Sequence, residues 1–246
     1  MAVQIPPKTG FEIWQEGLSA STADIKWDAW DCEIQLTANA YNRHLAGTTG
    51  YFPLDWQLIK AMLWVETGAD NAQWKTKPMQ IGVPGDPGLR SLLTGNEGGD
   101  LILPASFKGR LTPNSVTTNP ADNIRAGVGY LLMRMANFDY RSVADADRHV
   151  YEADVKAGDS LDRIAKTHGT TVGILKKLNP SVGTLRHGRT LKYQKASIQR
   201  VIVGWRQIST VSIALRYNGG GDPNYAKKLD YALALMRNRR AAVCAQ

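Results

Sequence analysis

The segment from Asp55 to Thr67 restricts the fold most, because a helix there would carry apolar side chains on nearly every side. Its apolar residues fall on two faces at helical spacing: Trp56, Ile59 and Leu63 on one, and Leu58, Met62 and Val65 on the other. A helix with apolar cover on most sides is buried inside a domain. The most apolar stretch, Ala61–Val65, is far too short to cross a membrane. The sequence therefore predicts a domain built around this helix.

A single carboxylate, Glu66, closes this apolar run and is followed by Thr67 and Gly68. Burial of the helix would disfavour the ionised carboxylate, and the negative end of the helix dipole acts in the same direction. Both effects keep a carboxylic acid protonated near neutral pH, as a general acid requires. The alternative is an ordinary solvated carboxylate at a helix end, and the local sequence alone favours that alternative.

Other segments predict helices around the central one: Trp27–Leu45, Asn119–Phe138, Gln207–Tyr217 and Asn224–Arg240. Residues 1–26 give mixed signals and are expected to wrap the surface. Residues 68–118 are rich in Gly, Pro, Asn and Thr, with only short helical possibilities such as 87–93. Loops of this length inside a compact domain usually have a function. A linker that includes Val201–Val203 is expected to precede the helix from Gln207.

Residues 145–193 differ in character and follow a pattern of strand, helix, helix and strand. The expected elements are a strand at 149–155, a helix after Asp159, a second helix after Thr170 or Thr171, and a strand at 190–193. The pair Asn179-Pro180 ends the second helix. We expect this piece to fold as a separate small unit.

Within that piece, VKAGDSLDRIAKTHGTTVGILKKLNP resembles a LysM module in its Gly-Asp-Ser-Leu turn, Ile-Ala helix, Gly-Thr-Thr-Val junction and Leu-Asn-Pro exit. LysM modules bind glycans containing N-acetylglucosamine in a shallow groove between the first strand–helix turn and the loop after the second helix. The resemblance places that groove between two sets of residues: Gly158, Asp159, Ser160 and Leu161, and Leu178, Asn179 and Pro180. The alternative is that these residues only cap helices and shape turns.

Three separated blocks of the flanking sequence resemble the lysozyme-like lytic transglycosylases, a superfamily that includes the goose-type lysozymes. The first block is Glu66-Thr67-Gly68 followed by Met79-Gln80-Ile81; the second is Asn123, Ile124, Gly127, Tyr130 and Leu131; the third, matched loosely, is Ala214–Gly220. Each block alone is weak evidence for the resemblance, but a chance match of all three blocks in this order is improbable. The chain differs from the family at Lys77-Pro78, where Gly-Leu is usual, and in carrying the LysM-like piece between the second and third blocks.

The resemblance implies a fold and a set of site residues. The fold is mainly α (α+β): a lysozyme-like helical domain over 1–144 and 198–246, discontinuous in sequence, with an inserted βααβ LysM domain over 145–197. Glu66 would be the catalytic acid, and Tyr217 would hydrogen-bond near its carboxyl. The implied substrate-binding residues are Thr67, Met79, Gln80, Tyr130, Tyr217 and Asn218.

The implied reaction is cleavage of the β-1,4 bond between N-acetylmuramic acid and N-acetylglucosamine in peptidoglycan. A hydrolytic muramidase of the lysozyme or endolysin type needs a second carboxylate, for which Asp70 and Asp86 are the local candidates. The alternative for Asp70 is a solvated carboxylate, and for Asp86, which lies within 84–88 among Pro and Gly, a turn is favoured over a catalytic role. A lytic transglycosylase needs only one Glu, because the substrate's own groups replace the second carboxylate and the water. This route is favoured over hydrolysis, and an inactive glycan-binding protein is a further alternative.

Composition limits the partners. Thirty Lys and Arg against 22 Asp and Glu give a net charge of +8, which suits anionic envelope polymers such as peptidoglycan strands. No dense basic block interleaved with aromatic residues occurs, so nucleic acid is not expected. The four histidines have no metal-ligand spacing, and neither a metal nor another cofactor is expected. Cys32 and Cys244 are either two free thiols or a disulfide.

The N-terminal residues lack the basic and apolar regions of a secretory signal peptide. We therefore expect synthesis in the cytoplasm of a bacterium or phage-infected cell and action on the periplasmic cell wall of a target cell. Delivery could be that of a phage lysin, a tail-associated enzyme or an antibacterial effector of a contractile (type VI) secretion machine. An effector would require a cognate immunity protein in its producer.

Overall fold

The computed structural model describes residues 7–237 and Cys244. Helices dominate, at about 49%, and the sheets are small. Phe138–Val201 form one compact unit, called here the insert unit. The described residues before and after it form the other, called here the helical unit. The fold is therefore mainly α with some β.

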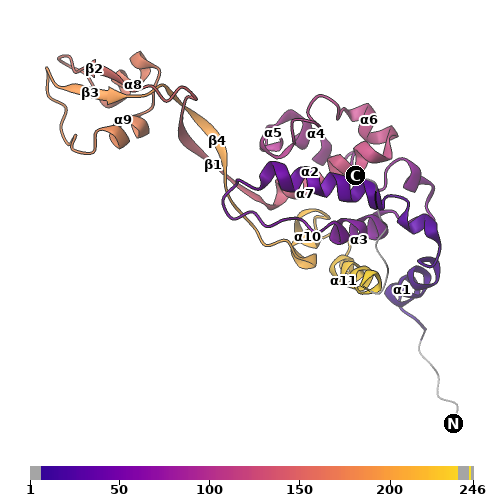
Figure 1. Ribbon diagram of the computed structural model, residues 1–246. Helices are drawn as coiled ribbons and strands as arrows, with labels where there is room; N and C mark the ends of the chain where they lie inside the picture. Colours follow the sequence, from indigo (N-terminus) through magenta and orange to yellow (C-terminus); the bar gives the residue numbers. More distant parts are fainter. Residues whose placement is uncertain (1–6, 238–243, 245–246) are drawn as a thin grey trace, which may run out of the picture. The chain divides into compact units, whose positions relative to one another are not determined.

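Nine helices and two 3₁₀ turns of the described chain lie in the helical unit (Figure 1). The helices are α1 (Gly10–Ser21), α2 (Asp31–Leu45), α3 (Trp56–Glu66), α4 (Gly88–Thr94), α5 (Gly99–Ile102), α6 (Pro113–Thr118), α7 (Pro120–Met135), α10 (Thr210–Arg216) and α11 (Tyr225–Met236), and the turns are Ile25–Asp28 and Ala72–Lys75. The expected helices around the central one are present, with their ends shifted by a few residues.

Helix α3 lies at the centre of this unit, as its apolar cover predicts. Ile59, Met62 and Leu63 are fully buried, and α2 and α11 both pack on the helix. The α3 N-cap is Asp55, whose side chain accepts from the backbone N of Gln57. The three helices fix the position of Glu66, the last residue of α3.

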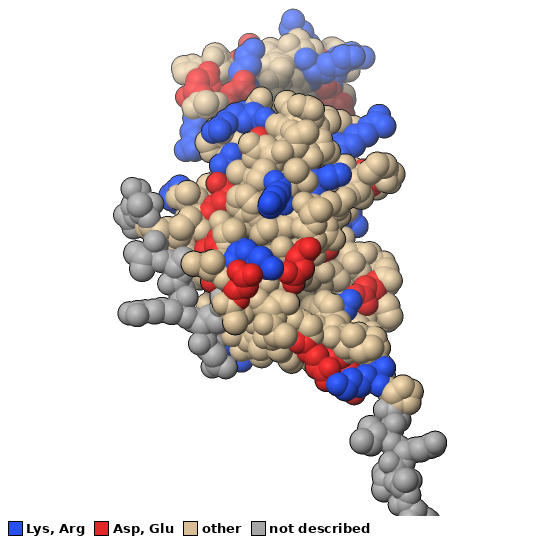
Figure 2. Space-filling view, turned by 90° about the vertical axis from the view of Figure 1, so that its right-hand side faces the viewer, with Lys and Arg blue, Asp and Glu red and all other residues tan. Residues whose placement is uncertain are grey.

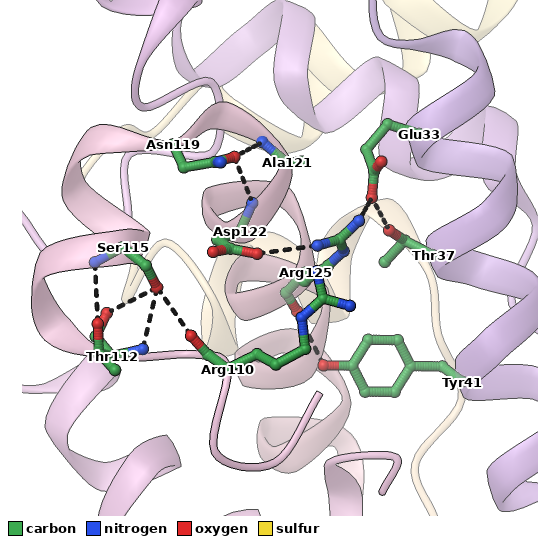
Figure 3. Close-up of polar contacts among 10 residues, drawn as sticks. All are labelled: Glu33, Thr37, Tyr41, Arg110, Thr112, Ser115, Asn119, Ala121, Asp122 and Arg125. Atoms are coloured by element: carbon green, nitrogen blue, oxygen red, sulfur yellow. Dashed lines mark hydrogen bonds and ion pairs between the residues drawn. The ribbon is translucent and has the colours of Figure 1, made fainter. Parts of the chain in front are cut away.

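Helices α2 and α7 are joined by a polar cluster at their interface (Figure 3). Arg125 of α7 forms ion pairs with Glu33 of α2 and with Asp122 of its own helix, both at 2.9 Å. The hydroxyl of Tyr41 donates to the carbonyl oxygen of Arg125 at 2.8 Å. The close approach needs Gly129, because a Cβ there would stand 2.4 Å from the Tyr41 hydroxyl. These contacts fix the position of α7 against α2, and with it the position of the loop that packs on α7.

Three sequence expectations need correction. Residues 10–21 form helix α1, with Thr9 and Glu12 in a capping box. Helix α7 ends at Met135 instead of near Phe138, because the chain turns at Ala136 into a strand. The expected linker around Val201–Val203 is also a strand.

These strands are β1 (Ala136–Ala144) and β4 (Ala196–Trp205), which pair with each other. Backbone hydrogen bonds flank the pairing at both ends, from Asp145 N to Lys195 O and from Arg206 N to Met135 O, each 2.8 Å. The strands therefore run in opposite directions. The local sequence pattern predicts neither strand, because the two strands that pair lie far apart in the sequence.

The insert unit contains the expected order β2 (Tyr151–Asp154), α8 (Leu161–His168), α9 (Val172–Leu178) and β3 (Thr190–Tyr193). Strands β2 and β3 are antiparallel, with Tyr151 opposite Tyr193. A small apolar core lies between these elements: Ala153, Val155, Ile164, Ala165, Leu175, Leu191 and Tyr193. Ser160 caps α8, and Thr171 caps α9. The compact unit extends beyond the expected 145–197 at both ends because β1 and β4 contribute to it.

Cys32 of α2 and Cys244 form a disulfide with a Cα–Cα distance of 5.3 Å. This decides between the two alternatives that the sequence left open. The expected end of the last helix at Arg240 lies outside the described residues. Within the described chain, none of the helices is long and apolar enough to cross a membrane.

Candidate active site

Glu66 stands half-buried at the C-terminal end of α3. Burial raises the pKa of its carboxyl to about 7. The hydroxyl of Tyr225 donates a hydrogen bond of 2.5 Å to Oε1 of Glu66, which acts in the opposite direction and lowers that pKa. A carboxyl group with this pKa is protonated in part of the molecules at neutral pH and can both give and take a proton.

Tyr225 is the first residue of α11, and its side chain is 2% exposed. Burial and the charge of Glu66 raise the pKa of its phenol, so Tyr225 remains a hydrogen-bond donor. Sequence reasoning did not select this residue. The available signal was an aromatic residue at the start of an apolar helix, which is more often a core residue.

The loop after Glu66 is closed by a set of hydrogen bonds. Gly68 has φ +71°, and a Cβ there would stand 3.1 Å from the Trp27 ring. The Thr67 hydroxyl lies 2.9 Å from the carbonyl oxygen of Pro78 and accepts from the side-chain amide of Gln80 at 2.9 Å. Thr67 and Gln80, two predicted site residues, are therefore in direct contact.

Gln80 itself has φ +52°, in the left-handed region that side chains other than glycine rarely adopt. Its amide nitrogen also donates to Gln73 Oε1 at 2.8 Å and to the carbonyl oxygen of Lys77. A residue held in such a conformation by several bonds is typical of a functional loop. The unusual Lys77-Pro78 pair lies inside this loop.

Met79 is fully buried and contributes to the loop through its backbone. Its amide donates to Oδ1 of Asn123 at 2.8 Å, and its carbonyl oxygen accepts from the Tyr217 hydroxyl at 2.9 Å. Its side chain packs on Gly127, where a Cβ would approach within 2.6 Å. These contacts give Met79 a structural role in the loop, and its contact with substrate stays a prediction.

Tyr217 follows α10 and lies next to Tyr130 of α7, with ring centroids 5.6 Å apart. Burial and then the charge of Glu66 raise the pKa of its phenol. The Tyr217 hydroxyl donates to the carbonyl oxygen of Met79, close enough to Glu66 for the charge of that carboxyl to act on its phenol, and Tyr225 makes the direct bond to Glu66. Asn218 Oδ1 accepts from the backbone N of Asp222 and holds the turn before α11.

Both candidates for a second carboxylate are engaged elsewhere. Asp70 pairs with Lys26 at 2.6 Å, is more than half exposed, and has its pKa lowered first by the hydrogen bond from Lys26. Asp86 accepts from the backbone N of Gly82 and of Gly88, at 3.0 and 2.7 Å. Asp86 therefore shapes a turn, as the local sequence favours. Among residues 7–237 and Cys244, no group of three or more His, Cys, Asp or Glu is arranged to hold a metal ion.

The expected glycan-binding residues of the insert unit shape its turns. Gly158 has φ +79°, and Asp159 Oδ2 accepts from the backbone N of Lys156 at 2.8 Å. Asn179 joins the exit of α9 to β3, because its side chain bonds both the N and the O of Lys192. Gly158, Ser160 and Pro180 are exposed, Leu161 packs partly on the core, and Leu178 is half-buried. These contacts order both sides of the expected groove.

The family model for the LysM domain matches residues 154–192. The match lies inside the insert unit and runs from the last residue of β2 through α8 and α9 into β3. It indicates that this unit binds peptidoglycan or a related glycan. No curated protein and no solved structure matches the chain.

Proposed function

We propose that this chain is a peptidoglycan-cleaving enzyme of lysozyme-like fold, in which Glu66 is the catalytic acid and the insert unit binds the wall. The observation that carries the proposal is the half-buried carboxyl of Glu66, with a pKa near 7 and a buried tyrosine as hydrogen-bond donor. Such a perturbed group beside an ordered loop is a candidate for general acid catalysis. The LysM match supports the same class of substrate, because LysM domains bind glycans.

In this reaction the protonated Glu66 gives its proton to the bridging oxygen as the bond from muramic acid C1 to that oxygen breaks. The carboxylate then accepts the proton of the muramic acid 6-hydroxyl, whose oxygen attacks C1 and closes a 1,6-anhydro ring. One carboxyl group with a pKa near 7 serves both steps. No water is consumed, so the reaction is that of a lytic transglycosylase.

The engagement of Asp70 and Asp86 supports this route over hydrolysis. Both retaining and inverting hydrolases require a second carboxylate facing the sugar. Asp70 forms an exposed ion pair with Lys26, and both oxygens of Asp86 accept backbone hydrogen bonds. Each carboxylate therefore has a partner within the protein, whereas Glu66 alone of the three combines burial with a raised pKa.

Mass spectrometry of peptidoglycan digested by the purified chain tests the proposal. We expect fragments ending in 1,6-anhydro-muramic acid, and none from the Glu66→Gln variant. Reducing muramic acid ends would show a muramidase instead. Intact wall after incubation with the wild-type chain would show a glycan-binding protein without this activity.

We further propose that the enzyme acts in the periplasm of a target cell as a delivered antibacterial effector, with a phage lysin as the alternative. The Cys32–Cys244 disulfide supports an oxidising compartment of action. An effector requires an immunity protein in its producer. A gene for a small inhibitor beside this one, whose product blocks wall cleavage, would distinguish the two; a neighbouring pore gene would favour the lysin.

A further inference from the structure

Three arginine residues lie together beside Tyr130 and Tyr217, and the proposed reaction uses none of them. Arg134 is in the last turn of α7, Arg206 follows β4, and Arg216 is the last residue of α10. All three side chains are half-exposed. They are called here the arginine cluster.

Hydrogen bonds hold the cluster together. Arg134 Nε donates to the carbonyl oxygen of Arg216 at 3.3 Å. Arg206 donates from its backbone N to the carbonyl oxygen of Met135 and from its side chain to the carbonyl oxygen of Ala136, both at 2.8 Å. Met135 and Ala136 are the two residues that follow Arg134 in the chain. Burial and then the positive charges of Arg216 and Arg134 lower the pKa of Arg206, in agreement with this proximity. The three guanidinium groups are therefore close enough for their positive charges to repel one another.

The charge of the cluster is poorly balanced by the protein. Arg134 pairs with Glu97 at 3.6 Å, between two half-exposed side chains. Within the described chain, neither Arg206 nor Arg216 forms an ion pair with a carboxylate. Close like charges repel, and an anion placed among them relieves that repulsion.

The cluster also borders the candidate active site. Tyr130 and Arg134 lie four residues apart on α7 and so share a face of that helix. Tyr217 follows Arg216 directly, and its hydroxyl bonds the carbonyl oxygen of Met79, next to Gln80. An anion held by the cluster would therefore lie close to a sugar strand bound beside Tyr130 and Tyr217.

We propose that the arginine cluster binds the free carboxylates of the peptide stems carried by the muramic acid residues of the substrate. This inference rests on the proposed function and specifies its substrate class as peptide-bearing strands. In intact wall the lactyl group of muramic acid is joined to the stem as an amide, so the free carboxylates of the strand belong to the peptides. The planar guanidinium group suits a carboxylate, which it can bind through two parallel hydrogen bonds.

On the face shown in Figure 2, blue Lys and Arg groups are interspersed with red Asp and Glu groups instead of merging into one broad basic band. The local site is instead defined by the contacts among the three arginines and by the lack of a carboxylate partner for Arg206 and Arg216 within the described residues. Such a site would bind in a salt-dependent manner, because half-exposed charges are screened.

Steady-state kinetics on two matched substrates test the inference. One is soluble glycan strands with stem peptides bearing free carboxylates, and the other is the same strands with those carboxylates converted to neutral amides. We expect Arg216→Gln to raise KM about tenfold on the native strands, with kcat and the KM for amidated strands little changed. Arg216→Lys should recover part of the loss. The control is Arg110→Gln, because Arg110 is an exposed residue of the same unit outside the cluster.

Equal KM values of the wild-type chain for both substrates, or an equal loss on both from Arg216→Gln, would overturn the inference while leaving the proposed function intact. Cleavage of neither strand by the wild-type chain would instead overturn the proposed function. Binding of a fluorescent acidic stem tripeptide to the full chain then decides the inference. Weaker binding by Arg216→Gln than by Arg110→Gln supports the site, and equal binding rejects it.

Discussion

The hydroxyl of Tyr225 donates a 2.5 Å hydrogen bond to Oε1 of Glu66, a residue 159 positions earlier in the chain. The two residues come from the start of α11 and the end of α3, which pack directly on each other. Burial raises the pKa of Glu66, and this bond restrains the increase. Burial of Glu66 and the bond from Tyr225 therefore act in opposite directions on the proton affinity of the candidate catalytic acid.

The variant Tyr225→Phe should move the pH dependence of wall cleavage. Removing the donor removes the interaction that lowers the pKa of Glu66, so the pKa rises above about 7. The decline of kcat/KM at alkaline pH should then shift upward by roughly one pH unit, as expected for a charged hydrogen bond worth about 1.5–3 kcal/mol. The measurement is the pH profile of fragment release. An unchanged profile with lower activity at every pH would assign Tyr225 a structural role only.

The variant Glu66→Gln should gain stability relative to the wild type as the pH rises. Because the folded-state pKa is about 7 and the ordinary value is 4.5, the unfolded chain loses this proton first between those pH values. The native state then binds more protons, so the wild type loses up to about 3 kcal/mol of unfolding free energy through that window. The variant has no such loss, and its advantage should be larger at pH 8 than at pH 4 by that amount.

Tryptophan fluorescence in urea titrations measures this effect in the helical unit alone, since all seven tryptophans lie outside 138–201. The matched control is Glu16→Gln, because Glu16 is exposed on α1 and forms an ion pair with Lys8 at the surface. A Glu66→Gln advantage that is the same at both pH values would contradict the raised pKa.

Removal of the insert unit should weaken wall binding and spare some cleavage. The pairing of β1 with β4 offers a site for the deletion, because Asp145 N donates to Lys195 O at 2.8 Å. Replacing residues 146–194 with Asn-Gly would join the strands as a hairpin. Sedimentation with purified wall, using Glu66→Gln chains with and without the insert, should show lower affinity without it. Unchanged affinity would reject wall binding by this unit.

Reduction of the Cys32–Cys244 disulfide should destabilise the helical unit. The bond joins residues 212 positions apart, and closing so long a loop restricts the unfolded chain, an effect worth about 2–5 kcal/mol. We expect a reductant to lower the melting temperature of tryptophan fluorescence by about 5–15 °C. The Cys32→Ser chain should melt at the lower temperature with or without reductant. Identical melting of the wild type in both conditions would show that the bond does not contribute.

Local patterns in the sequence were sufficient for several features of this protein. The apolar cover of residues 56–65 predicts a buried helix, since a helix with apolar side chains on most sides is stable only inside a domain. The strand–helix–helix–strand order of the insert unit follows from short alternating and helical patterns separated by Gly, Asn and Pro. The position of Glu66 at a helix end also follows from the sequence, because Gly68, two residues later, is a typical helix terminator.

Only the tertiary structure decided which partners meet. The bond from Tyr225 to Glu66, the pairing of β1 with β4, the disulfide and the arginine cluster all join residues far apart in the chain. Their local sequences carry little sign of them, because the energies that select such contacts come from burial and charge in the folded core. The raised pKa of Glu66 is the clearest case: the sequence places a carboxylate at the end of an apolar helix, and the packing of α11 against that helix sets its affinity for a proton.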